Sequence, residues 1–187
     1  MIVWLAQKTL FLLGWRLEGA PPEYSRAVVI AAPHTSNWDF PLLLLFAVAC
    51  NLKIRWMAKH SLFIPPLGFM FRAIGGIAIK RDRKNNIVAN MIDLFITQKK
   101  LLLVIPVEGT RSYAEHWKSG FYHIAHGANV PILPSYLDYG SKQGGFGPEI
   151  HTTGDIAKDM GILRAFYAPI RGKFPSLAGK IKLREEQ

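Results

Sequence analysis

The sequence predicts a single-domain α/β fold in which helices flank a central sheet that is mostly parallel or mixed. Short apolar runs rich in β-branched residues alternate along the chain with segments of helical periodicity, and this alternation is typical of such sheets. The chain has 187 residues without an internal repeat or a linker. This length suits one domain with a hydrophobic core of its own.

The first half of the domain alternates between strands and helices. Residues 27–32 are continuously apolar and predict a buried strand, and the apolar run at 38–50 is long enough for a buried helix. Residues 54–58 predict a second strand. Two prolines and a glycine within 64–68 indicate a loop or the start of a short helix, and a glycine pair opens a third strand at 76–80.

The second half continues the alternation. In order, the expected elements are an amphipathic helix at 86–97, an apolar strand at 101–106, a helix ended by glycine at 121–127 and an apolar strand at 129–137. Residues 140–187 are richer in loops. There we expect one more strand near 149–152 and one more helix near 157–166.

The N-terminal residues 1–18 predict a helix ahead of the main domain, which comprises residues 19–187. No stretch approaches the ~18–20 uninterrupted apolar residues that a membrane-spanning helix requires. Trp4, Trp15 and Arg16 suit the headgroup boundary of a membrane, so an interfacial anchor is one interpretation of this helix. The other is a terminal helix packed on the domain, and the sequence leaves both open.

The chain is both basic and apolar. It has 23 Lys and Arg against 13 Asp and Glu, a formal net charge of +10, and half of its residues are hydrophobic. This hydrophobicity excludes a disordered basic tail, and the scattered basic residues, without a known binding motif, argue against a nucleic-acid partner. A single cysteine, Cys50, excludes an intrachain disulfide and a Cys-rich zinc site. We therefore expect an anionic, apolar partner, such as an anionic membrane surface.

A histidine and an aspartate follow the first expected strand. His34 and Asp39 are five residues apart, so they cannot share a helix face, but they can meet if only Asp39 lies in the helix. Asp39 would then orient the imidazole and stabilise its protonated form, which makes His34 a candidate general base. Alternatively, Ser36 and Asp39 form a capping box, in which Asp39 accepts hydrogen bonds from backbone N–H groups.

Two further polar segments follow apolar strands and are candidates for binding phosphate. After the strand at 101–106, Gly109 permits a tight turn and the planar guanidinium of Arg111 can hold a phosphate with two hydrogen bonds. Glu108 could orient Arg111 or accept a hydrogen bond from a substrate hydroxyl. Arg81, where the third strand ends, is the other phosphate candidate. Taken alone, each segment also fits an ordinary turn with surface salt bridges.

Taken together and in order, these segments resemble the four motifs of the glycerolipid acyltransferases, the relatives of 1-acylglycerol-3-phosphate acyltransferase. The motifs are His34-x4-Asp39, Gly76 through Arg81, Glu108-Gly109-Thr110-Arg111-Ser112 and Val130-Pro131-Ile132-Leu133-Pro134. Each motif is weak alone, but four in order at suitable spacing form a strong signal. The sequence departs from the family pattern at Val107, where a proline is usual, and at Lys80, where an acidic or small residue is common.

The resemblance implies a glycerol-3-phosphate acyltransferase-like fold and an O-acyltransferase of phospholipid biosynthesis. An acyl group would pass from acyl-CoA or an acyl carrier protein to a hydroxyl of a lysophospholipid acceptor, 1-acylglycerol-3-phosphate, with His34 and Asp39 as catalytic residues. It also implies a substrate-binding role for Arg81, Glu108, Gly109, Thr110, Arg111 and Lys118. The alternatives are another acceptor (a different lysolipid or an amino-acid lipid) and a non-catalytic membrane- or lipid-binding protein.

No cofactor is expected, because acyl-CoA or the acyl carrier protein acts as a co-substrate. His123 and His126 lie three residues apart on an expected helix, but no third ligand has suitable spacing, so we expect no metal site. The charge and the apolar N-terminal helix predict a peripheral or monotopic membrane protein on the cytoplasmic face of the membrane.

Overall fold

The computed structural model describes residues 1–19, 23–79 and 84–186. Seven strands in these ranges form one sheet in the order β1-β7-β6-β2-β5-β3-β4. They are β1 (Arg16–Glu18), β2 (Arg26–Ala31), β3 (Ile54–Lys59), β4 (Gly76–Ile79), β5 (Leu101–Pro106), β6 (Ile132–Asp138) and β7 (Gln143–Phe146). Neighbouring strands are parallel except for β6 and β7, which are antiparallel. The mostly parallel α/β sheet predicted from the sequence is confirmed.

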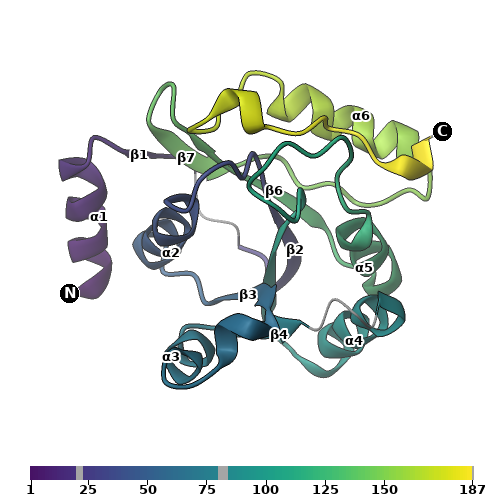
Figure 1. The fold of residues 1–187 in the computed structure, drawn as a ribbon, viewed down its shortest axis with the longest axis horizontal. Coiled ribbons are helices and arrows are strands. Elements are labelled where there is room, and N and C mark those ends of the chain that lie inside the picture. Colours follow the sequence, from purple (N-terminus) through teal and green to yellow (C-terminus); the bar gives the residue numbers. More distant parts are fainter. Residues whose placement is uncertain (20–22, 80–83, 187) are drawn as a thin grey trace.

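Helices cover both faces of this sheet. They are α1 (Ile2–Leu12), α2 (Asp39–Ala49), α3 (Leu67–Ala73), α4 (Lys84–Thr97), α5 (Gly120–Ala128) and α6 (Ile156–Tyr167), with short 3₁₀ turns at His60–Phe63, Pro175–Leu177 and Arg184–Glu186. Figure 1 shows α1, α2 and α3 on one side of the sheet and α4, α5 and α6 on the other. The domain is therefore three layers thick.

The central strand β2 supplies side chains to the core on both faces of the sheet. Val28 and Ile30 belong to the cluster that packs under α4, α5 and α6, whereas Ala27 and Val29 belong to the cluster that packs under α2 and α3. Successive side chains of a strand point to opposite faces. The continuous apolar run of β2 is thus explained by burial on both faces, as expected for parallel strands.

One expected strand is replaced by another. Near 149–152 the chain makes only an isolated bridge, between Ile150 and Ile132, and the strand β7 forms earlier, at Gln143–Phe146. Glycines in β7 weaken its sequence signal. The fold requires them, because a Cβ on Gly144 would lie 2.6 Å from the Phe46 ring.

The N-terminal helix is shorter than the expected 1–18. It ends at Leu12, and Arg16–Glu18 instead forms β1, which pairs with β7 at the sheet edge. Ala6 and Leu10 of α1 are buried against α2, while Trp4 and Phe11 are exposed. The helix is therefore packed on the domain and also exposes apolar side chains, and the interfacial anchor stays a prediction. No helix in the described ranges has the length and hydropathy of a membrane span.

Candidate active site

Three parallel strands bring the candidate site together. β2 lies between β5 and β6 and is parallel to both, so the carboxyl ends of the three strands lie at one edge of the sheet. His34 follows β2, Glu108 follows β5 and Tyr139 follows β6. Ligand sites of parallel α/β sheets lie at this edge.

His34 and Asp39 form a hydrogen-bonded pair. His34 Nδ1 lies 3.0 Å from Asp39 Oδ2, and Asp39 is the first residue of α2. Because a carboxylate only accepts hydrogen bonds, this contact places the imidazole proton on Nδ1 and leaves Nε2 as an acceptor. The His34 side chain is 18% exposed, so the imidazole is held by the protein but reaches the surface.

The capping interaction considered as an alternative is also present. Asp39 Oδ2 accepts hydrogen bonds from the backbone N–H groups of Thr35 (3.0 Å) and Ser36 (2.9 Å). Asp39 Oδ1 accepts a 2.7 Å hydrogen bond from the Tyr139 hydroxyl. Burial alone raises the pKa of Asp39, but the hydrogen bonds from His34, Tyr139 and Ser36 outweigh it and hold that pKa below its usual value. Asp39 is thus a stable carboxylate facing the imidazole.

Glu108 does not face the substrate side as the sequence led us to expect. It is 2% exposed, and its two oxygens accept hydrogen bonds from the backbone N–H groups of His34 (2.8 Å) and Gly179 (3.0 Å). Burial raises its pKa, and the two N–H donors offset this only in part. Glu108 therefore holds the loop that carries His34, and both of its oxygens are occupied.

The chain after α6, residues 168–186, crosses the site edge and is called the C-terminal segment below. Arg171 N–H donates to Asp138 Oδ1 at 3.1 Å, Phe174 N–H donates to Thr35 Oγ1 at 3.2 Å, and Gly179 N–H donates to Glu108. The segment therefore contacts the chain after β6, then the His34 loop, then the chain after β5. In Figure 1 it runs along the top of the view in yellow.

Of the remaining substrate-binding candidates, three are exposed on the surface, one is a glycine in a turn, and one lies outside the described residues. Thr110, Arg111 and Lys118 are exposed, and Gly109 has a φ of +68°, the left-handed conformation that glycine adopts readily. Arg81 lies outside the described residues. The structure thus places Thr110 and Arg111 just beyond β5, next to the strand that leads to His34.

Lys118 lines a hollow of about 590 Å³ that does not include the His34–Asp39 pair. Its lining contains Glu115, Glu185 and Arg184, so cations and carboxylates are mixed there. The hydrogen bond from Lys118 N–H to Val107 O (2.8 Å) fixes its backbone beside the third motif. Within the described part of the chain, no three His, Cys, Asp or Glu side chains are grouped so that they could hold a metal ion.

Sequence reasoning missed Tyr139 and the C-terminal segment. A signal for Tyr139 existed, because the expected strand 129–137 ends just before it and site residues follow strand ends. Residues 168–186 carried no such signal, since they form a loop-rich stretch without a motif.

Comparisons with known proteins identify the family. The model of the Acyltransferase family matches residues 16–138, and a search of curated proteins finds no significant match. Among solved structures, the chain is similar to the crystal structure of the 1-acyl-sn-glycerophosphate (LPA) acyltransferase, PlsC, from Thermotoga maritima. The TM-score is 0.62 at 18% sequence identity, over 90% of this chain and 77% of that chain.

The two comparisons carry different weight. At 18% identity, the likeness to PlsC shows the fold. The family match covers more than half of the 187 residues and includes the His34–Asp39 pair and the segment after β5, which confirms the resemblance drawn from the four motifs. The chain therefore belongs to the Acyltransferase family and is an acyltransferase.

Proposed function

We propose that this acyltransferase moves a fatty acyl group from acyl-CoA or an acyl carrier protein to a hydroxyl of 1-acylglycerol-3-phosphate, in phospholipid biosynthesis. The observation that carries the proposal is the 3.0 Å contact between His34 and Asp39 in a chain of this family. The choice of acceptor is supported by PlsC, which shares the fold and is a 1-acyl-sn-glycerophosphate acyltransferase.

The reaction proceeds by direct transfer. His34 Nε2 takes the proton of the acceptor hydroxyl while the hydroxyl oxygen bonds to the carbonyl carbon of the thioester. The tetrahedral intermediate then collapses, the carbon–sulfur bond breaks, and the leaving thiolate takes the proton back from Nε2. Asp39 keeps the Nδ1 proton in place and stabilises the imidazolium between the two steps.

The proposal is tested by replacing His34. His34→Ala should lower turnover by about 10²–10⁴ and leave the folded state intact, because the side chain is partly exposed. His151→Ala is the control, since His151 is an exposed histidine outside the site. The assay follows a labelled acyl group from acyl-CoA to the acceptor. Wild-type turnover of folded His34→Ala would refute the mechanism, and release of free fatty acid instead of acylated lipid would indicate a thioester hydrolase.

Arg111 is assigned to the acceptor phosphate. It is exposed just after β5, and a guanidinium matches a phosphate with paired hydrogen bonds. Arg111→Ala should therefore raise the KM for 1-acylglycerol-3-phosphate and lower kcat. Lys99→Ala is the control, because Lys99 is an exposed cation just before β5, at the opposite end of the same strand. Equal kinetics in both variants would remove Arg111 from the binding site.

The enzyme works as a peripheral or monotopic protein on an anionic membrane surface, on the cytoplasmic face, where acyl-CoA and carrier proteins are found. Support comes from the outer face of α1, where large apolar side chains are exposed: Ile2, Trp4, Leu5, Phe11 and Leu12. Lys8 Nζ lies 5.7 Å from the Trp4 ring centre, so this apolar surface also carries a cation that can contact anionic lipid headgroups. The net charge of +10 adds a general attraction to anionic lipids.

Sedimentation with vesicles tests the membrane surface. Phe11→Ser, at a side chain that is 73% exposed, should weaken binding to vesicles containing anionic lipid by about tenfold, because one large apolar side chain no longer inserts. Ile96→Ser changes a side chain of similar exposure, 69%, on α4, which covers the other face of the sheet. Equal binding by the two variants would contradict a membrane contact through α1.

A further inference from the structure

The C-terminal segment places a cation beside the catalytic loop. Lys173 Nζ lies 5.5 Å from the centre of the Trp38 ring and 5.9 Å from that of Phe174. Trp38 directly precedes Asp39 and is 62% exposed. Aromatic faces attract an ammonium group without neutralising its charge. The amino group of Lys173 is thus held beside Trp38, the residue that precedes Asp39.

The backbone on both sides of Lys173 is fixed against the His34 loop. Gly172 is buried, and a Cβ there would lie 2.7 Å from Thr35 Oγ1 and 3.2 Å from Pro33 Cγ. On the other side, Phe174 N–H donates to Thr35 Oγ1 at 3.2 Å. Lys173 therefore lies between two anchored neighbours, and its position relative to His34 is determined by the fold.

No carboxylate of the described residues forms an ion pair with Lys173. Two nearby members of the C-terminal region do have such partners, since Lys180 pairs with Glu115 and Arg164 pairs with Glu186. A fixed cation without a paired carboxylate is able to bind an anion without first breaking a salt bridge. Other exposed Lys and Arg side chains of the described residues also lack an ion pair, but Lys173 combines this with contacts to two aromatic rings, one of which belongs to the residue before Asp39.

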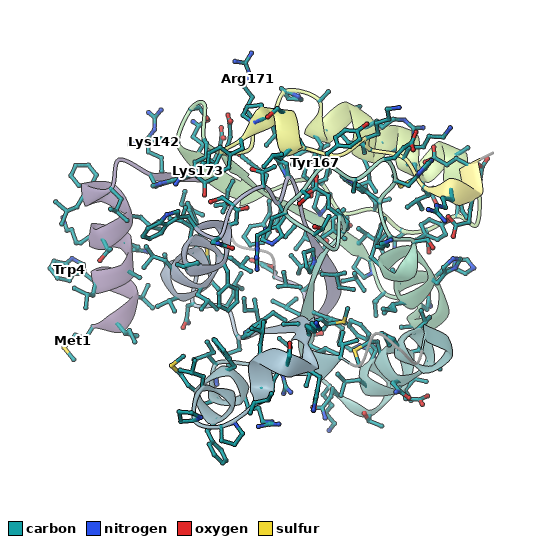
Figure 2. The ribbon with its side chains drawn as sticks, viewed as in Figure 1. Met1, Trp4, Lys142, Tyr167, Arg171 and Lys173 are labelled. Atoms are coloured by element: carbon teal, nitrogen blue, oxygen red, sulfur yellow. The ribbon has the colours of Figure 1, made fainter. Side chains whose placement is uncertain are left out.

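Lys173 and Arg111 lie on opposite flanks of the catalytic loop. The C-terminal segment reaches the loop from the β6 side, where Arg171 N–H is bonded to Asp138, whereas Arg111 follows β5. β5 and β6 are the two neighbours of β2 in the sheet. In Figure 2, Arg171 projects outward from the molecule, and Lys173 lies inward of it.

Two substrates that each carry phosphate need two such cations. In the proposed reaction, the acceptor oxygen must lie between His34 Nε2 and the thioester carbon, so donor and acceptor enter from different directions. Resting on that proposed function, we propose that Lys173 binds a phosphate of the acyl donor. Its ligand is a phosphate of CoA or the phosphate of a carrier protein's phosphopantetheine arm, and Arg111 serves the acceptor.

The test compares three donors that carry the same acyl group and differ in phosphate. They are acyl-CoA, S-acyl-4′-phosphopantetheine and S-acyl-pantetheine, which has no phosphate. Lys173→Met and the control Arg171→Met remove one exposed cation each, two residues apart in the same segment. Kinetics are measured in neutral detergent micelles, so that membrane charge does not contribute.

Lys173→Met should raise the KM for acyl-CoA about tenfold, as expected for one charged hydrogen bond. It should leave the KM for S-acyl-pantetheine and for the acceptor unchanged, and Arg171→Met should behave as wild type. If the KM for S-acyl-4′-phosphopantetheine rises by the same factor as the KM for acyl-CoA, the contact is with the arm that CoA shares with carrier proteins. If only the KM for acyl-CoA rises, the contact is with the nucleotide of CoA.

The assignment of Lys173 would be overturned if the KM for S-acyl-pantetheine rose as much as the KM for acyl-CoA. It would also be overturned if only the KM for the acceptor rose. Calorimetry measures the same contact without turnover. CoA should bind about tenfold more weakly to Lys173→Met, and 4′-phosphopantetheine should bind more weakly only if the contact is with the arm. Unchanged binding of CoA to that variant also overturns the assignment. Failure of the proposed function itself looks different, because wild-type protein would then transfer no acyl group from any donor.

Discussion

Tyr139 donates a 2.7 Å hydrogen bond from its hydroxyl to Asp39 Oδ1, although the two residues are 100 positions apart in the chain. The backbone N–H of Tyr139 donates to Arg171 O at 2.9 Å. One residue directly after β6 thus connects the carboxylate of Asp39 with the C-terminal segment. Burial and the contact with Asp39 raise the pKa of Tyr139, so its hydroxyl remains a donor at physiological pH.

Tyr139→Phe should shift the pH dependence of the reaction. Without this donor, the carboxylate of Asp39 attracts the protonated imidazole more strongly, so the acidic limb of kcat/KM moves to higher pH by roughly 0.5–1 unit, the equivalent of one hydrogen bond. Tyr136→Phe is the control, because Tyr136 also donates a 2.7 Å hydrogen bond to a carboxylate, that of Glu18, away from the site. Identical pH profiles for the two variants would contradict this role of Tyr139.

Glu108→Gln should lower both stability and turnover. Glutamine keeps one acceptor oxygen, and its amide NH₂ would face a backbone N–H donor, so either His34 or Gly179 loses its partner in a buried site. We expect the free energy of unfolding to fall by about 1–3 kcal/mol, measured by urea denaturation. Glu115→Gln, at an exposed pair with Lys180, should change it by less than about 1 kcal/mol. Equal stability of the two variants would show that Glu108 is not a structural link.

Gly172→Ala should disturb the site through packing alone. The new Cβ would lie 2.7 Å from Thr35 Oγ1, so the C-terminal segment or the His34 loop must move. We expect a loss of about 1–3 kcal/mol in stability, with a lower kcat. Gly120→Ala is the control, since no atom lies within 4 Å of its added Cβ and alanine favours the helix. A Gly172→Ala protein as stable and active as Gly120→Ala would refute the close contact.

Asp39 should stabilise the protein in a pH-dependent way. Its pKa in the folded state lies below the usual 3.8, so the folded state binds its proton less tightly than the unfolded chain does. The resulting stability is present above that usual value and is lost as the pH falls through the lower folded value. The difference in unfolding free energy between wild type and Asp39→Asn should therefore be largest near pH 7 and shrink below about pH 4. Urea denaturation at several pH values measures it, and a constant difference would contradict the prediction.

Local patterns predicted most elements because the signals that make them are local. The strands β2 and β5 are buried on both faces of the sheet. A strand of this kind appears in the sequence as an uninterrupted run of apolar residues. β1 and β7 were not predicted. They are three and four residues long, and β7 contains two glycines, so their local signal is weak. They form because β7 pairs with β6 at the sheet edge and β1 pairs with β7.

The sequence alone indicated that the candidate site residues follow strands and so lie at one edge of the sheet. His34, Asp39 and Arg111 follow expected strands, and in a parallel sheet strand ends on neighbouring strands meet. The direction of a side chain was decided only by the tertiary structure. Glu108 lies three residues before Arg111 in the same motif, yet its side chain turns inward and accepts hydrogen bonds from the backbone of His34 and Gly179. Tyr139 and Lys173 reach the site from distant parts of the chain, because packing of β6 and the C-terminal segment, rather than any local pattern, brings them beside Asp39 and Trp38.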